Sequence, residues 1–154
     1  MFETIKHKKQ ILAILIRTQY KTEGIKFFSP EDFPQQIGYM NHKSGYNIKP
    51  HMHNSFNRKI NLTQETLYIK SGKLRVDFYN NDQSYLKSKI LFEGDFILLA
   101  SGGHGFKVLE SCEIIEIKQG PYNADIDKVS CGCGKILLRY EEAGCYLSRL
   151  KNLR

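Results

Sequence analysis

The sequence predicts an all-β fold, an antiparallel sandwich or barrel built from a single domain. The chain has 154 residues, 41% of them hydrophobic, which is enough for one buried core. Between residues 47 and 118 short apolar or alternating runs recur, and turn residues separate them. No long helical pattern lies between these runs. A succession of short strands without intervening helices is typical of antiparallel β proteins.

The N-terminal part of the chain predicts less regular structure. The segment Ile11–Tyr20 is apolar, but its periodicity is too weak to choose between a helix and a strand. The stretch from Ser29 to Phe33 predicts the start of a helix of one or two turns. Ser29 can cap the first N–H groups, Pro30 suits the first turn, and two acids lie near the positive end of the helix.

From residue 47 onward the pattern predicts a series of strands. The expected strands are Asn47–Asn54, Thr63–Lys70, Lys73–Tyr79, Lys87–Phe92, Phe96–Ala100, Gly105–Leu109 and Cys112–Lys118. Turns are expected at Ser71-Gly72, Asn80-Asn81-Asp82 and Glu93-Gly94-Asp95, with Glu110-Ser111 as a hairpin tip. Within one strand Leu74, Val76 and Phe78 alternate onto a single face. After Lys128 the pattern is lost, and three leucines (147, 150 and 153) could stripe a short terminal helix.

The net charge of +7 raises the question of a nucleic-acid partner. Residues 1–26 hold six Lys/Arg and two Glu, and residues 135–154 hold five Lys/Arg and two Glu. Residues 27–134 hold twelve charges of each sign. The excess therefore belongs to the two ends, and no nucleic-acid partner is expected. Basic ends can contact phosphates or anionic lipid, or they can stay solvated and aid solubility.

Hydropathy and cysteine usage bear on the compartment. The longest apolar run, Ile11–Ile16, has six residues, far fewer than the ~20 that span a bilayer. It is also too short for a signal-peptide core, and no small-residue cleavage site follows it. We therefore expect a cytoplasmic protein without a membrane span, whose four cysteines stay reduced. One residue separates Cys131 from Cys133, whereas zinc knuckles use about two to four, so no zinc knuckle is expected there.

Two histidines and a glutamate begin the candidate site. His51 and His53 are two residues apart in an expected strand, so both rings leave the same face. Two neighbouring imidazoles form a metal clamp when other ligands complete the shell. Glu65 shares its side of the next expected strand with Leu67 and Ile69. It should therefore point into the core, where a carboxylate must be paired or metal-bound.

His104 is the fourth candidate. It follows the apolar run Phe96–Ala100 and shares its parity with Phe106 and Val108, so it too should face inwards. Taken one by one, the four candidate residues have plainer explanations as surface, loop or edge side chains. Only their combination points to a metal site.

Two stretches of the chain resemble the motifs of the cupin superfamily. Gly45, followed after five residues by His51-Met-His53 and later by Glu65 and Gly72, resembles the first cupin motif. The stretch Gly94–His104 resembles the second. The chain is most similar to small bacterial single-domain cupins, a group without an assigned reaction that is loosely associated with gene clusters for surface sugars. The stretches that carry this narrower similarity are Ser71–Tyr79, Leu98–Phe106 and Ile115–Tyr122.

The resemblance implies a domain plan, a cofactor and an assembly. It implies a cupin-type jelly-roll β-barrel over residues 24–122, between a basic N-terminal extension (1–23) and a C-terminal extension (123–154). Residues 54–64 would form an inserted loop, because eleven residues separate His53 from Glu65. One divalent transition metal (iron, manganese, nickel, cobalt or zinc) would be held by His51, His53, Glu65 and His104. A homodimer is expected by analogy with cupins.

The implied function is metal-dependent chemistry on a small oxygenated substrate related to a sugar or nucleotide sugar, either isomerisation, epimerisation or dioxygen chemistry. Glu65 would serve as ligand or as proton acceptor. Arg58 could clamp a substrate carboxylate or phosphate, or it could stay solvated. Gln64 is expected to face away from the site, and His42 is assigned no role. The alternative is a non-catalytic cupin that binds a sugar or small acid as a sensor or partner protein.

Overall fold

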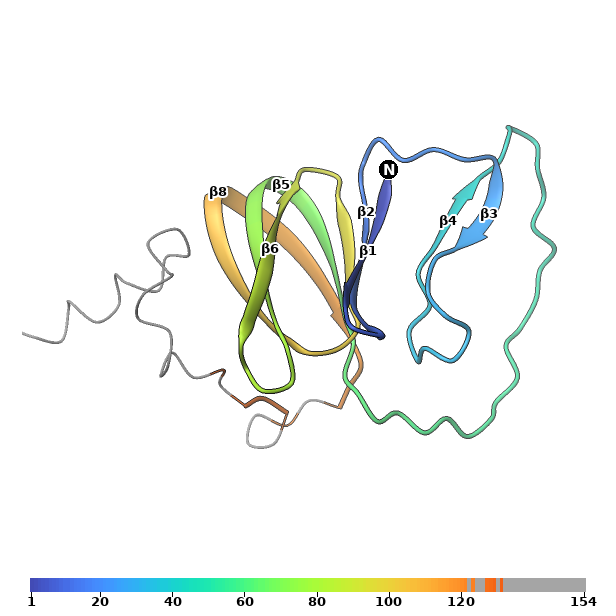
Figure 1. Cartoon of the computed structure of the whole chain (residues 1–154). Coiled ribbons are helices and arrows are strands. Elements are labelled where there is room, and N and C mark those ends of the chain that lie inside the picture. Colours follow the sequence, from blue (N-terminus) through green and yellow to red (C-terminus); the bar gives the residue numbers. More distant parts are fainter. Residues whose placement is uncertain (122, 124–126, 130, 132–154) are drawn as a thin grey trace, which may run out of the picture.

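The computed structural model describes residues 1–121, 123, 127–129 and 131, and all regular elements in this part are β-strands. The strands, in chain order (Figure 1), are β1 (Phe2–His7), β2 (Gln10–Ile16), β3 (Gly24–Phe27), β4 (Gly38–Asn41), β5 (Glu65–Tyr79), β6 (Tyr85–Phe92), β7 (Phe96–Leu99) and β8 (Gly103–Lys118). The described residues contain no helix, which confirms the predicted all-β class for this part of the chain.

Six strands form one antiparallel sheet that curls on itself into a half-barrel (Figure 1). Their order is β1-β2-β7-β5-β6, and β8 pairs along the other edge of β5. The curl brings β1 and β6, the first and last strands of this order, close to each other. Lys89 of β6 donates a hydrogen bond to Glu3 of β1 at 2.5 Å. The predicted barrel-like antiparallel architecture is confirmed at this level.

The two longest strands, β5 and β8, replace four of the shorter expected strands. The turn expected at Ser71-Gly72 and the hairpin tip expected at Glu110-Ser111 are both wrong, because these residues lie inside continuous strands. Gly72 has a φ of 82°, and a Cβ placed on it would lie 1.9 Å from the carbonyl oxygen of Ser111. The pairing register shifts three times around this glycine. Ser71-Gly72 and Glu110-Ser111 therefore form a bulge that bends the paired strands β5 and β8, and both strands continue through it.

The core fills the inside of the curl. Leu74, Val76 and Phe78 are at most 1% exposed, as their alternation predicts. They pack in one cluster with each other and with apolar residues from four other strands, β1, β2, β6 and β7. The cluster consists of Ile5, Leu12, Ala13, Leu15, Leu67, Ile69, Leu74, Val76, Phe78, Leu91, Ile97 and Leu99. Burial of these side chains is the main stabilising contribution that positions the ends of β5 and β8.

The expected N-terminal extension (1–23) is part of the sheet. β2 pairs with β7 from Ala13–Leu99 to Ile16–Phe96, and β1 pairs with β2. The undecided apolar segment is thus a strand. Its periodicity is weak because both of its faces are covered: Leu15 packs in the main cluster, whereas Ile14 and Ile16 pack in a second one. A strand buried on both faces has a continuous apolar run.

The second cluster joins the main sheet to the small antiparallel sheet β3–β4. Ile37 lies in it beside Ile14 and Leu98, with Phe28 and Phe33 packed against them. The short helix expected after Ser29 is wrong. Residues 30–33 form a turn, closed by a hydrogen bond from the Phe33 N–H to the Pro30 carbonyl at 3.1 Å. The Ser29 hydroxyl instead accepts a bond from the Ile37 N–H at 3.0 Å and so ties the loop ends together.

Residues 42–64, the β4–β5 segment, contain no strand, and each residue from 43 to 63 is exposed. The strand expected at Asn47–Asn54 is therefore wrong for this structure. The strand expected at Thr63–Lys70 begins at Glu65, as the first part of β5. An extended stretch forms a ladder only when a neighbouring strand pairs with it, and residue pattern alone does not supply that neighbour.

In the part of the chain that the structure describes, no helix is long and apolar enough to cross a bilayer. Several expectations concern residues outside this part: Cys133, Cys145 and the terminal helix with its three leucines.

Candidate functional site

Glu65 is the first residue of β5 and lies where β5, β7 and β8 meet. Its backbone pairs with Leu99 of β7 on one side and with Lys118 of β8 on the other. The residue is only 8% exposed, and its companions Leu67 and Ile69 are 2% and 0% exposed. Alternation therefore predicted its burial correctly. The carboxylate lies at the end of the core and needs a partner there.

His104, the second residue of β8, supplies that partner. Its Nε2 donates to the Glu65 Oε2 at 3.0 Å. In the ladder His104 lies opposite Phe78, so it starts on the inner face of the sheet, as its parity predicts. Farther along β8 the inner face is exposed to solvent. Phe106 and Val108 pair with the core residues Val76 and Leu74 but are 45% and 57% exposed.

The electrostatic environment keeps Glu65 ionised. The hydrogen bond from His104 lowers the pKa of Glu65 below its ordinary value and outweighs the burial that raises it. The charges of His104, Lys118 and Lys128 lower this pKa further. Near neutral pH the site therefore holds a carboxylate with donors around it. Such a group can accept a substrate proton or contribute to the binding of a cation.

Gln64 is a site residue that the sequence misplaced. It was expected to face outwards, but it is 2% exposed because the loop after β3 covers it. Its side-chain oxygen accepts from the Gln35 N–H at 3.1 Å, and its own N–H donates to the Gln119 side chain at 2.7 Å. These bonds tie the chain just before Glu65 to the loop after β3 and to Gln119. Alternation indicates the side of a strand but not whether another segment covers that side.

The other two predicted ligands lie in the exposed β4–β5 segment. The rings of His51 and His53 meet edge to face with their centroids 5.4 Å apart. The His51 Nδ1–H donates to the Lys49 carbonyl at 2.9 Å. The structure thus contains two predicted pairs, Glu65–His104 and His51–His53. Among its described residues it does not gather three His, Cys, Asp or Glu side chains into a group that could hold a metal ion.

Arg58, the predicted substrate clamp, lies in the same segment. Its guanidinium carbon is 3.6 Å from the centroid of the Phe56 ring, a cation–π contact within the segment. Cys131 lies near the start of β8, since a Cβ placed on Gly103 would be 2.8 Å from its sulfur.

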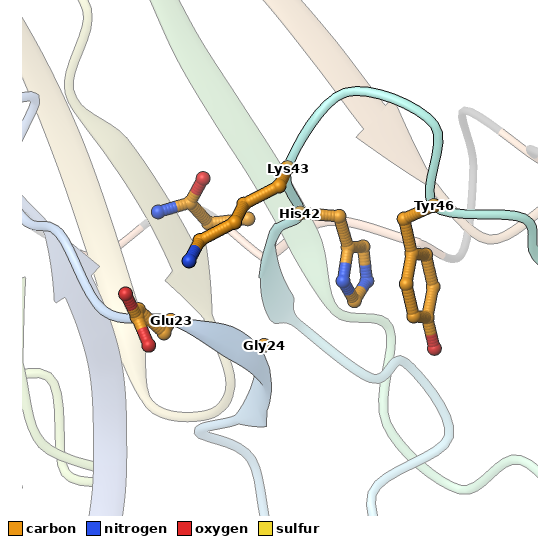
Figure 2. Close-up of a pocket in the computed structure, with 6 residues that line it drawn as sticks. Glu23, Gly24, His42, Lys43 and Tyr46 are labelled. Carbon is orange, nitrogen blue, oxygen red and sulfur yellow. The ribbon is translucent and has the colours of Figure 1, made fainter.

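A pocket of about 400 Å³ lies at the open end of the β3–β4 hairpin (Figure 2). His42, which the sequence left without a role, lines it and stacks on Tyr46 with the ring centroids 3.9 Å apart. Glu23 and Lys43 also face this pocket. A second pocket, of about 430 Å³, contains Gln64 and Ala100 in its wall and so lies beside the start of β5.

No family model, curated protein or solved structure matches this chain. The contact between Glu65 and His104 is therefore interpreted from the chemistry of this chain's own residues.

Proposed function

We propose that this protein binds one divalent transition metal ion and acts on a small oxygenated molecule such as a sugar. The hydrogen bond between Glu65 and His104 carries the proposal, because it joins two predicted ligands 39 positions apart in the sequence. The cupin-type jelly roll that the motifs predict belongs to the same proposal. The half-barrel, with its polar pair at the end of the core, supports it.

The pair fits one edge of a metal site. Two ligand atoms bound at right angles to an ion about 2.1 Å away lie ~3.0 Å apart, which matches the separation of the His104 Nε2 and the Glu65 Oε2. A metal ion would replace the proton that these atoms share. One imidazole and one carboxylate suit iron, manganese, nickel, cobalt or zinc.

His51 and His53 would complete the ligand set. The Lys49 carbonyl accepts the Nδ1 proton of His51, which leaves the lone pair on Nε2 for a metal ion. To bring both rings to His104, the β4–β5 segment would have to approach the start of β8. In the described residues β8 pairs only with β5, so its outer edge is open to another strand. Pairing there would also cover Phe106 and Val108.

A bound metal ion would supply a Lewis acid for a carbonyl or hydroxyl group. The protein would supply the ionised Glu65 as ligand or proton acceptor, with His104 orienting it. Lys118 and Lys128, whose charges act on Glu65, favour a substrate that carries a carboxylate or several hydroxyl groups. These lysines also support the second candidate, a non-catalytic protein that binds a sugar or small acid directly on Glu65 and His104.

Metal analysis tests the proposal. Untagged protein, reconstituted with each candidate metal and desalted, should retain about one equivalent of one of them. His104→Ala, Glu65→Gln and His51→Ala should each lose most of this metal, whereas His7→Ala, outside the predicted set, should retain it. Wild-type protein without stoichiometric metal would overturn the metal site. Binding of sugars or small acids that depends on Glu65 and His104 would then establish the second candidate.

A further inference from the structure

The β4–β5 segment (residues 42–64) is a third basic region of the protein, besides the two ends of the chain. It contains Lys43, Lys49, Arg58 and Lys59 and no Asp or Glu, so its net charge is +4. Residues 65–118, by contrast, hold seven Lys/Arg and eight Asp/Glu. The zero net charge of residues 27–134 is thus the sum of +4 in this segment, −2 in residues 27–41, −1 in residues 65–118 and −1 in residues 119–134. The basic excess is not confined to the two ends of the chain.

The same segment exposes large apolar side chains. Figure 1 shows it as a wide strand-free path from β4 to β5, outside the main sheet. Six of its apolar residues are about half exposed or more: Met52 (94%), Phe56 (62%), Tyr46 (59%), Leu62 (56%), Ile48 (52%) and Ile60 (47%). Single exposed apolar residues are ordinary, but six within 17 residues give this one segment an unusual amount of exposed apolar side chain.

Basic and aliphatic side chains together fit one kind of partner best. Lysine and arginine attract the anionic headgroups of a bilayer, and aliphatic side chains enter the boundary between headgroups and acyl chains. Aliphatic side chains offer no stacking surface to nucleic-acid bases, which stack on aromatic rings. Its Phe56 and Tyr46 rings are each engaged on one face: Arg58 covers one face of Phe56, and His42 covers one face of Tyr46.

A second copy of the chain fits this surface less well. Contact between two β4–β5 segments would bring four positive charges against four others. We propose that the β4–β5 segment docks this protein onto an anionic lipid bilayer. Its lysines contact the headgroups, and Ile48, Ile60 and Leu62 insert beside them. This inference goes beyond the proposed metal site and does not use its histidines.

Vesicle co-sedimentation tests the docking. Full-length protein should bind vesicles of mixed phosphatidylcholine and phosphatidylserine but not vesicles of phosphatidylcholine alone, and added salt should weaken the binding. The triple variant Lys43→Gln, Lys49→Gln, Lys59→Gln should lower the partition coefficient at least about tenfold. The triple variant Ile48→Ser, Ile60→Ser, Leu62→Ser should also lower it.

A matched control removes the same charge elsewhere. Lys6, Lys87 and Lys107 are exposed on β1, β6 and β8, and their joint change to Gln should leave vesicle binding within about twofold of wild type. All variants keep His51 and His53, so unchanged metal content separates this test from that of the metal site. Circular dichroism should show native strand content in each, since the segment contributes no strand.

Three results would overturn the proposal. The first is an absence of wild-type binding to the mixed vesicles. The second is an equal loss of binding in the control variant, which would show a general charge effect. The third is tighter binding to single-stranded DNA than to vesicles, with the same dependence on the three lysines, which would assign the segment to nucleic acid.

Discussion

The Nε2 of His104 lies 3.0 Å from the Oε2 of Glu65, although the two residues stand at opposite ends of the β5–β8 ladder. Glu65 pairs with Lys118 at one end, and His104 pairs with Phe78 near the other. They meet because β5 and β8 curl with the sheet. Glu65 also pairs with Leu99 of β7, which is only five residues before His104. The contact therefore depends on the curvature of the whole half-barrel.

The bulge at Gly72 is one source of this curvature, and Gly72→Ala should disturb it. The residue has a φ of 82°, and its Cβ would collide with the Ser111 carbonyl. We expect the free energy of unfolding to fall by about 2–5 kcal/mol. Gly45→Ala is the matched control: its φ is 85°, but no atom lies within 4 Å of the added Cβ. Chemical denaturation should give a loss of only about 1–2 kcal/mol there.

The ion pair between Arg17 and Asp95 should be far more important to stability than the surface ion pairs. Asp95 is 1% exposed and accepts bonds from the Arg17 guanidinium and from the N–H groups of Thr18 and Phe92. Asp95→Ala leaves these donors without their acceptor and should cost about 3–5 kcal/mol. Glu113→Ala, which breaks only the exposed pair with Lys70, should cost less than about 1 kcal/mol. Similar losses for the two variants in urea denaturation would contradict this.

The lowered pKa of Glu65 makes folding stability depend on pH in a defined direction. The ionised carboxylate stabilises the fold above the unfolded-state pKa, and this contribution is lost as pH falls through the lower folded-state pKa. With EDTA present, wild-type protein should therefore lose stability below about pH 4.5 more steeply than Glu65→Gln. His104→Ala removes the main cause of the lowered pKa. Its unfolding free energy should therefore also fall less steeply at acid pH than that of the wild type. Urea midpoints measured from pH 7 to pH 3 would show this, and parallel curves would refute it.

The N-terminal strands should be indispensable to the fold. Leu15 of β2 is 0% exposed in the main core cluster, so Leu15→Ala should destabilise the protein by about 2–5 kcal/mol. Ile25 of β3 is 50% exposed, and Ile25→Ala should cost less than about 1 kcal/mol. Thermal unfolding measures both. If Leu15→Ala behaved like Ile25→Ala, residues 1–23 would be an extension after all.

Local alternation predicted several features of the fold correctly. Leu74, Val76 and Phe78 share a buried face, and Glu65 is buried with Leu67 and Ile69. These predictions succeeded because successive side chains of a strand point to opposite faces, whatever the strand pairs with. The turn signals were less specific. Glycine with positive φ serves turns and bulges alike, so Ser71-Gly72 predicted a chain reversal where the structure has a bend.

The sequence by itself determined the all-β class, the inward side of β5 and the inward placement of two polar residues, Glu65 and His104. Only the tertiary structure decided which of those residues meet. It joined Glu65 to His104, covered Gln64, and left His51 and His53 on an exposed segment. The physical reason is that side-chain direction follows from local backbone geometry, whereas contact between distant strands depends on curvature, register and burial summed over the whole sheet.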